Sequence, residues 1–206
     1  YALEDVIGNG STAIIRRGCN LRTDEAVAIK TIRLKDAQGK DIWSPRHLEQ
    51  LMAEVDISFA CRHPSLIKSY GAFFGASTLD IVMELALGGE VMVAFANETY
   101  HSEVRAQLIL RQVCSALWYL HAKSIAHRDV KAENVMYACK THCAVKLVDF
   151  GCARSGFSKD ERYKVARRTL IGTVFYMAPE MFREADGSRL KMGDRCVIYG
   201  TEVDMW

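Results

Sequence analysis

Short apolar runs separated by turn residues fill the first third of the chain, and this spacing is typical of β-strands. The runs predict five strands, at residues 3–7, 13–19, 25–32, 67–73 and 79–84. A polar stretch at 35–44 is expected to be a loop. A helix should follow it, because Ser44 suits an N-cap and Pro45 suits the first helical position. Its apolar face is predicted to comprise Leu48, Leu51, Met52, Val55 and Phe59.

Beyond Gly88 and Gly89 the pattern becomes helical. A long helix is expected over residues 102–122, with an apolar face made by Leu110, Val113, Cys114, Leu117 and Leu120. The chain thus runs from a strand-rich half through a connector at 84–89 into a helical half. This order predicts an α+β fold with a cleft between unlike halves, and clefts are where ligands bind.

Composition narrows the class of protein. Half of the 206 residues are hydrophobic and 25% are charged, the balance of a globular domain with a core. The net charge of +2 is too small to indicate a nucleic-acid or membrane-surface partner. No apolar run approaches the roughly 18 residues that a membrane-spanning helix needs. The chain starts at Tyr1 rather than Met, so its beginning says nothing about targeting.

Seven cysteines are scattered along the chain, an odd number that favours free thiols over a disulfide framework. We therefore expect a reducing compartment, the cytoplasm or the nucleus. Cys139, His142 and Cys143 allow two interpretations, a partial metal site or a turn between strands at 135–137 and 145–148. The turn is favoured, because the sequence offers no second pair of ligands.

A glycine-containing turn, Gly8-Asn9-Gly10-Ser11-Thr12-Ala13, joins the first two predicted strands. Glycines let a backbone turn tightly and bring its N–H groups close to phosphate oxygens. Alone, such a turn is equally typical of an ordinary hairpin. A dinucleotide-binding fold would need a helix next, whereas Ile14 and Ile15 begin another strand.

Lys30 ends the third apolar strand, a place where lysine is usually a solvated tip. Glu54, midway along the following helix, neighbours that helix's apolar stripe and is expected to face the sheet. An ion pair between Lys30 and Glu54 would hold the ammonium group where it can reach nucleotide phosphates.

The strongest chemical signal is residues 127–134, with the sequence HRDVKAEN. Asp129 can orient an attacking hydroxyl and accept its proton, and Lys131 can neutralise charge on a transferred phosphoryl group. Asn134 can offer an amide oxygen to a metal ion. Asp149, which begins the sequence DFG at the end of an apolar strand, can bridge that metal to the β- and γ-phosphates. These oxygen ligands favour Mg²⁺ over zinc.

In this order, and ending with the sequence APE at 178–180, these segments resemble the eukaryotic protein kinase superfamily over the whole chain. Lys131, two residues after Asp129, resembles the serine/threonine pattern. Residues 1–17, the insert before the helix at Ser44, and Arg111 with Gln112 are most similar to the calcium/calmodulin-dependent kinase group.

The resemblance implies a bilobal α+β kinase fold in one catalytic domain, residues 1–206. An N-lobe of antiparallel sheet plus one helix is expected at 1–83, a hinge at 84–89, and a helical C-lobe at 90–206 that is cut off at the start of its central helix. It also implies a serine/threonine protein kinase that uses ATP and Mg²⁺.

By similarity, catalysis is assigned to Asp129, Lys131, Asn134, Lys30 and Glu54, and metal binding to Asn134 and Asp149. The implied ATP site comprises Ile7, Gly8, Asn9, Gly10, Ser11, Thr12, Ala13, Ile15, Ala28, Lys30, Met83, Glu84, Ala86, Glu90, Glu133, Met136 and Asp149. Within it Met83 would be the gatekeeper, and Glu84 and Ala86 would supply hinge backbone groups. The adenine ring would lie between Ile15, Ala28 and Met136, with Glu90 reaching the ribose.

The expected partners are protein substrates carrying Ser or Thr and an activating kinase or regulatory protein, without nucleic acid or a membrane span. Glu90 and Glu133 match acidic positions that select basic residues upstream of the target, so such a preference is hypothesised. Thr169 is the candidate activation-loop phosphosite, with Arg128 as the phosphate's partner. Thr173 is expected to shape the substrate pocket.

The chain departs from the family pattern in three places. Ala13 replaces the third glycine of the loop, and its methyl group is expected to weaken the grip on the nucleotide. Ser58 and Ser69 stand where large apolar side chains usually stack on Phe150 and His127, at a cost of about 1–3 kcal/mol for each hydroxyl left without a partner. Because the central helix would begin at Asp204, we expect residues 1–206 alone to be unstable and nearly inactive.

Two other functions remain as alternatives. One is a pseudokinase, a scaffold or nucleotide-binding module, which Ala13 and the paired serines favour and the complete set of catalytic residues opposes. The other is a small-molecule kinase, against which the 178–180 segment and Thr173 argue because they shape a platform for a peptide.

Overall fold

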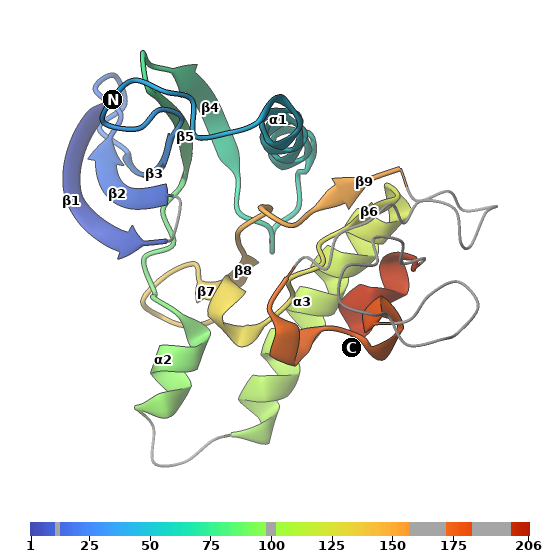
Figure 1. Cartoon of the computed structure of the whole chain (residues 1–206). Coiled ribbons are helices and arrows are strands. Elements are labelled where there is room, and N and C mark those ends of the chain that lie inside the picture. The colour runs from blue at the N-terminus through green and yellow to red at the C-terminus, as the bar shows by residue number, and fades with distance from the viewer. Residues whose placement is uncertain (11–12, 98–101, 157–171, 183–198) are drawn as a thin grey trace.

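The computed structural model describes residues 1–10, 13–97, 102–156, 172–182 and 199–206. A twisted sheet and one helix form the upper half of the molecule, and the other two helices lie in the lower half (Figure 1). The α+β arrangement of two unlike halves that the sequence pattern predicts is confirmed.

Five antiparallel strands make the sheet, in the order β1-β2-β3-β5-β4. Their bounds are Ala2–Asn9 for β1, Ala13–Cys19 for β2, Ala26–Arg33 for β3, Ser69–Phe74 for β4 and Thr78–Glu84 for β5. All five lie where the apolar runs predict them. Because β3 is paired on both edges, it carries Lys30 into the middle of the sheet, opposite Ile15 of β2 and Ile81 of β5.

Helix α1, Pro45–Ala60, packs on this sheet. Its predicted cap is confirmed: the Ser44 hydroxyl accepts the N–H of His47 at 3.3 Å, and Pro45 follows at the first position. Leu51 and Val55 of α1 are buried in one cluster with apolar side chains of the sheet, which are Ile32, Leu79 and Ile81. The helix is therefore held against β3 and β5, and this contact sets the position of Glu54.

The lower half contains helix α2, Val91–Ala96, and helix α3, Glu103–Ala122. Four short strands follow, β6 at Ile125–Ala126, β7 at Val135–Tyr137, β8 at Val145–Leu147 and β9 at Arg154–Ser155. They pair as β6 with β9 and β7 with β8. Short 3-10 turns occupy Ala132–Asn134, Val174–Tyr176, Pro179–Phe182 and Thr201–Met205.

The largest buried cluster joins the two halves. It contains Ile57 and Cys61 from the end of α1 and its C-cap, Leu117 and Leu120 from α3, and Phe150. Burial of this apolar surface is the main force that holds the sheet half and the helical half together.

The predicted apolar faces of the two long helices are partly wrong. Leu48 is 37% exposed and Leu110 is 61% exposed, and Cys114 is exposed too. Strands β6 and β8 cover α3 along the side that carries Ala116 and Leu120, so Leu110 and Cys114 remain at a surface hollow. Helical spacing identifies a stripe of apolar residues, whereas the width of the buried stripe depends on what packs against it.

The segment from Cys139 to Cys143 lies between β7 and β8, as the turn interpretation predicts. His142 stacks on Tyr137 with ring centroids 4.2 Å apart, and the Cys139 thiol contacts the Thr141 hydroxyl at 2.9 Å. Within the described residues there is no cluster of three or more His, Cys, Asp or Glu side chains suited to a metal ion. The described helices also include none that is long and apolar enough to cross a membrane.

Candidate functional site

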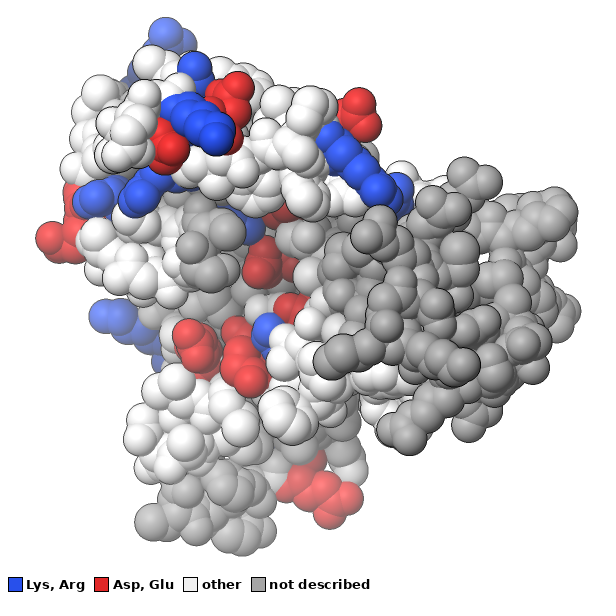
Figure 2. Space-filling view, in the orientation of Figure 1, with Lys and Arg blue, Asp and Glu red and all other residues white. Residues whose placement is uncertain are grey.

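Lys30, Glu54 and Asp149 form a chain of charges across the space between the halves. The Lys30 ammonium lies 3.2 Å from Glu54 Oε1 and 3.0 Å from Asp149 Oδ1. The predicted Lys30–Glu54 pair is therefore present, and Asp149, 119 residues after Lys30, joins it. Figure 2 shows acidic and basic side chains together in the hollow between the two halves.

Burial and mutual attraction compete in this charge chain. Burial tends to lower the pKa of Lys30, but the charges of Glu54 and Asp149 outweigh it and raise that pKa. Burial raises the pKa of Glu54, and Lys30 only partly offsets this. Burial also acts to raise the pKa of Asp149, yet the Lys30 charge and the Gly151 N–H lower it overall. Lys30 is thus a cation and Asp149 an anion at neutral pH.

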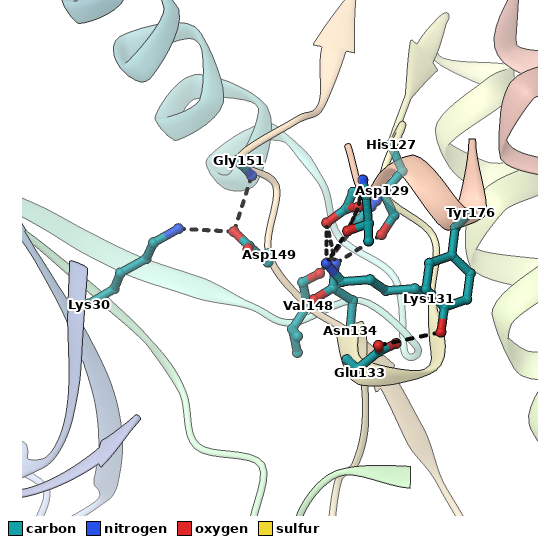
Figure 3. A network of polar contacts seen from close by, with 11 residues as sticks. Lys30, His127, Asp129, Lys131, Glu133, Asn134, Val148, Asp149, Gly151 and Tyr176 are labelled. Carbon is teal, nitrogen blue, oxygen red and sulfur yellow. Dashed lines mark hydrogen bonds and ion pairs between the residues drawn. The ribbon is translucent and has the colours of Figure 1, made fainter. Parts of the chain in front are cut away.

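A second cluster surrounds Asp129, in the loop between β6 and β7 (Figure 3). Its Oδ2 atom accepts from the Asn134 amide at 3.0 Å and lies 2.9 Å from the Lys131 ammonium. Its Oδ1 atom accepts from the N–H of Thr173 at 2.8 Å and from the Thr173 hydroxyl at 2.9 Å. Lys131 also donates to that hydroxyl at 2.6 Å, so the four groups form a closed network.

This network controls the charge of Asp129. Burial alone would raise its pKa, but the hydrogen bonds from Lys131 and Thr173 and the Lys131 charge lower it below the ordinary value. The carboxylate is therefore ionised at neutral pH and can only accept hydrogen bonds. A hydroxyl group brought near it would be oriented with its proton toward Asp129.

The backbone of the Asp129 loop is held in an uncommon conformation. Arg128 has φ 66° and Asp149 has φ 63°, values that side chains other than glycine adopt rarely. Asp204 stabilises the positive φ of Arg128, because its carboxylate accepts the N–H groups of His127 at 2.7 Å and Arg128 at 2.6 Å. Gly172, with φ 118°, passes so close that a Cβ there would lie 2.5 Å from the Arg128 carbonyl oxygen.

The ring of His127 is fully buried, and burial lowers its pKa. It contacts the Val148 carbonyl at 3.3 Å through Nε2 and lies 5.6 Å, between ring centroids, from Phe150. Ser58 and Ser69 are also buried. The Ser58 hydroxyl donates to the Val55 carbonyl at 2.7 Å, so the cost expected for an unmet hydroxyl does not arise there.

The residues assigned to adenine contact lie where β2, β3, β5 and β7 approach the connector. Ala28 pairs with Met83 across β3 and β5, and Met136 bridges to Glu90. Within the described part of the chain, the N–H of Ala86 has no acceptor and is free for a ligand. The Glu84 carboxylate instead lies 2.9 Å from Lys146, and its N–H donates to the Lys68 carbonyl at 2.8 Å, so neither group is available to this site.

The predicted phosphate-binding turn joins β1 to β2 as a hairpin. Gly8 pairs with Ile15 and Asn9 with Ile14, and the Gly10 N–H donates to the Ala13 carbonyl at 2.8 Å. Ile7 is half exposed at the end of β1. Ser11, Thr12 and the candidate phosphosite Thr169 lie outside the described residues.

Three contacts of this region were not anticipated from the sequence. Tyr199 accepts from the Arg128 guanidinium at 3.0 Å, and the Cys152 carbonyl accepts from it at 2.6 Å. His121 of α3 lies 2.8 Å from the Asp204 carboxylate. The Cys152 thiol is partly buried, and burial raises its pKa to about 11, so it is a poor nucleophile.

A family model described as "Protein kinase domain" matches residues 1–206. The chain is 34% identical over 206 residues to the probable serine/threonine-protein kinase fhkC of Dictyostelium discoideum, covering 100% of this chain and 32% of that protein. It is 32% identical over 207 residues to calcium/calmodulin-dependent protein kinase type IV of Mus musculus, covering 100% and 38%. For myosin light chain kinase A of Dictyostelium discoideum the identity is 34% over 207 residues, covering 100% and 62%. The chain thus spans less than two thirds of each relative.

Proposed function

The chain belongs to the protein kinase family, and from this premise we propose that it transfers the γ-phosphate of ATP to serine or threonine side chains of protein substrates. The resemblance to serine/threonine kinases, including the calcium/calmodulin-dependent group, is confirmed by the relatives. The observation that carries the proposed reaction is the ionised Asp129 carboxylate, held by Lys131, Asn134 and Thr173.

In the proposed mechanism, Asp129 accepts the hydrogen bond of the substrate hydroxyl and takes its proton as the oxygen attacks the γ-phosphorus, while the bond from that phosphorus to the β–γ bridging oxygen breaks and ADP leaves. Burial tends to lower the pKa of Lys131, but its hydrogen bond and ion pair with Asp129 outweigh this effect and raise that pKa. Lys131 therefore stays charged and offsets negative charge on the transferred group. Lys30 binds the α- and β-phosphates, and Glu54 holds its ammonium group in place. Hydrogen bonds and ion pairs already hold these side chains in place, and such preorganisation is the source of electrostatic catalysis.

The donor set of the site fits Mg²⁺. The Asn134 amide nitrogen is bound to Asp129, which leaves its carbonyl oxygen free, and Asp149 uses Oδ1 for Lys30 and Gly151. Within the described residues Asp149 Oδ2 has no donor, and the Asp149 side chain is 47% exposed. We propose that Asn134 and Asp149 hold the metal through these oxygens. Bound Mg²⁺ would supply charge neutralisation of the triphosphate.

We further propose that acidic side chains select basic residues upstream of the target. Glu90 and Glu133 are both exposed, and Glu133 lies 3.4 Å from the Tyr176 hydroxyl in the segment after Thr173. Carboxylates in these positions would pair with Arg or Lys of a peptide. A peptide library is the test, and a preference for acidic or proline-directed sites would contradict the proposal.

Regulation is proposed to act through phosphorylation of Thr169, with Arg128 as one partner. A cavity of about 570 Å³ beside α1 supports this, because Arg46, Arg128 and Arg154 line it. The three arginines would pair with a phosphate dianion, although Glu49, Glu54 and Asp149 line the same cavity. Replacing Thr169 by Ala should prevent activation by an upstream kinase, whereas Lys140→Ala, at an exposed position of the β7–β8 turn, should not.

The direct test is phosphorylation of a Ser/Thr peptide by the full-length protein with Mg²⁺ and ATP. Asp129→Asn should lower kcat by roughly 100- to 10,000-fold while nucleotide binding persists, because only the proton acceptor is lost. Nucleotide binding without any Asp129-dependent transfer would instead identify a pseudokinase. Labelling of a small molecule in place of protein would identify the other alternative. The full-length protein is used because the chain spans less than two thirds of the relatives that it matches.

We also propose a reducing compartment, the cytoplasm or the nucleus. The support is that all six cysteines within the described residues are free thiols. Localisation of the tagged full-length protein in the secretory pathway would contradict this.

A further inference from the structure

A concave surface lies where the segment after α1 meets the connector between the two halves. Its volume is about 470 Å³, and its principal lining residues are Arg62, His63, Lys68, Tyr70, Glu84 and Lys146. These six define what we call the basic pocket. None of them belongs to the charge chain at Lys30 or to the network around Asp129.

The basic pocket carries uncompensated positive charge. Lys146 is paired with Glu84, whose two carboxylate oxygens each lie 2.9 Å from its ammonium group. Arg62 and Lys68 are exposed and, within the described residues, have no carboxylate partner. Arg62 donates to the Ser69 carbonyl at 3.3 Å, and the Lys68 ammonium lies over the Tyr70 ring, 5.0 Å from its centroid. The pocket thus has two cations more than its own acidic group can balance.

His63 adds no charge to this surface near neutral pH. Burial and the nearby Lys146 charge lower its pKa. Its Nδ1 atom accepts the N–H of Ser65 at 3.1 Å, and its Nε2 atom lies 3.2 Å from the Ser115 hydroxyl. Its ring therefore forms a neutral wall of the pocket, tied to α3.

The remaining walls are apolar. Tyr70 is 45% exposed, so part of its surface is open to a ligand, while Leu66 and Cys61 form a buried floor. A surface that combines cations without a carboxylate partner with a partly exposed aromatic ring suits a ligand with both acidic and apolar groups. A nucleic acid or a membrane would need an extended basic face, and the net charge of the whole chain is only +2.

We propose that the basic pocket docks an acidic peptide segment of a partner protein, one that presents Asp or Glu side chains around an apolar residue. The carboxylates pair with Lys68 and Arg62, and the apolar side chain packs against the part of Tyr70 that is exposed and that Lys68 does not cover. Among the pocket residues only Glu84 is also assigned to the ATP site, and there through its backbone rather than its carboxylate, so docking would recruit a partner without blocking the cleft.

Binding is measured by fluorescence anisotropy of a labelled Glu-Glu-Leu-Glu-Glu peptide with the full-length protein, in the absence of ATP. Saturable binding that weakens with salt is expected, and Lys68→Glu should raise Kd by about tenfold or more, since reversing one charge costs at least ~1.4 kcal/mol. Lys40→Glu is the matched control, because Lys40 is also exposed but does not line the pocket, and it should change Kd less than about twofold. Unchanged peptide phosphorylation by Lys68→Glu verifies folding, and Lys68→Ala serves as a second variant.

The proposal is overturned if the acidic peptide shows no saturable binding, if Lys40→Glu weakens binding as much as Lys68→Glu, or if a Lys-Lys-Leu-Lys-Lys peptide binds equally well. Displacement of the acidic peptide by low millimolar inorganic phosphate would identify a site for a single anion and would also overturn it. The measurement does not use catalysis, so its failure and a failure of the proposed kinase activity are distinguishable.

Discussion

The carboxylate of Asp204 accepts the backbone N–H of Arg128 at 2.6 Å, across 76 residues of sequence. The same carboxylate accepts the N–H of His127, and its side chain is completely buried. Arg128 has a positive φ, a conformation that costs free energy unless neighbours stabilise it. Asp204 supplies that stabilisation and thereby positions Asp129, the next residue.

Removing this carboxylate should damage both stability and catalysis. In Asp204→Ala two N–H groups lose their acceptor, so the free energy of unfolding should fall by about 2–5 kcal/mol. The value of kcat should fall as well, because Arg128 can relax to a negative φ. Denaturant unfolding and peptide phosphorylation of the full-length protein measure the two effects. Asp204→Asn, which keeps one oxygen acceptor, is the matched control and should lose less; a change below about 1 kcal/mol in Asp204→Ala would contradict this role.

The Thr173 hydroxyl links Asp129 to Lys131 and should matter to the chemical step. Thr173→Ala removes a hydrogen bond of 2.9 Å to Asp129 and one of 2.6 Å from Lys131. We expect kcat to fall about tenfold, the effect of roughly one net hydrogen bond on a barrier. Thr173→Ser keeps the hydroxyl and should retain most of the activity. Equal losses in the two variants would assign the effect to the methyl group.

Protonation of Glu54 should determine how kcat/KM falls at acidic pH. Its folded-state pKa is raised above the ordinary 4.5 by burial. Because this pKa is raised, the ionised Glu54 lowers the free energy of unfolding at pH values above its pKa in the folded protein. That loss of stability disappears as the pH falls through the folded-state pKa toward the ordinary value of 4.5. Asp129 and Asp149 have lowered pKa values and stay ionised in that window. Activity should therefore decline as Glu54 gains a proton and loosens Lys30.

The corresponding variant is Glu54→Gln. Its free energy of unfolding at pH 7 should equal or exceed that of the wild type, because a buried charge is removed, while kcat/KM falls. As the pH is lowered toward 4.5, the wild-type activity should fall, whereas the activity of Glu54→Gln, normalised to its own maximum, should not. Profiles of kcat/KM against pH for both proteins make the comparison. Coincident acid limbs would show that another group titrates.

Ser58 should tolerate loss of its hydroxyl. The hydroxyl bonds to the Val55 carbonyl within α1, so Ser58→Ala leaves no other group without a partner. The free energy of unfolding should change by less than about 1 kcal/mol. Val55→Ala, in the same helix, removes buried methyl groups and should cost about 2 kcal/mol. A large loss in Ser58→Ala, seen by thermal or denaturant unfolding, would reveal a role for the hydroxyl beyond the helix.

Local patterns were sufficient for much of this protein. Apolar runs, the cap at Ser44 and the turn at 139–143 depend on neighbours in sequence, so these elements are predicted correctly, whereas the sequence pattern gives no range for α2, β6 and β9. The sequence also predicts site residues in segment 127–134 and at Asp149, because each group of polar residues lies within a few positions of the chain. The Lys30–Glu54 pair also followed, since one helical stripe sets the direction of Glu54.

The burial of individual side chains and the pairing of distant charges depended on which segments meet in space. The exposure of Leu110 and Leu48 follows from which elements cover each helix, and helical spacing carries no information about that cover. The basic pocket brings together Lys68, Glu84 and Lys146 from separate segments. By itself, then, the sequence determined most of the elements and the polar groups proposed for catalysis, because those rest on local hydrogen bonding, short spacings and side-chain periodicity. Only the tertiary structure decided burial and which distant charges are paired, because both arise from packing between segments that the chain's order does not place together.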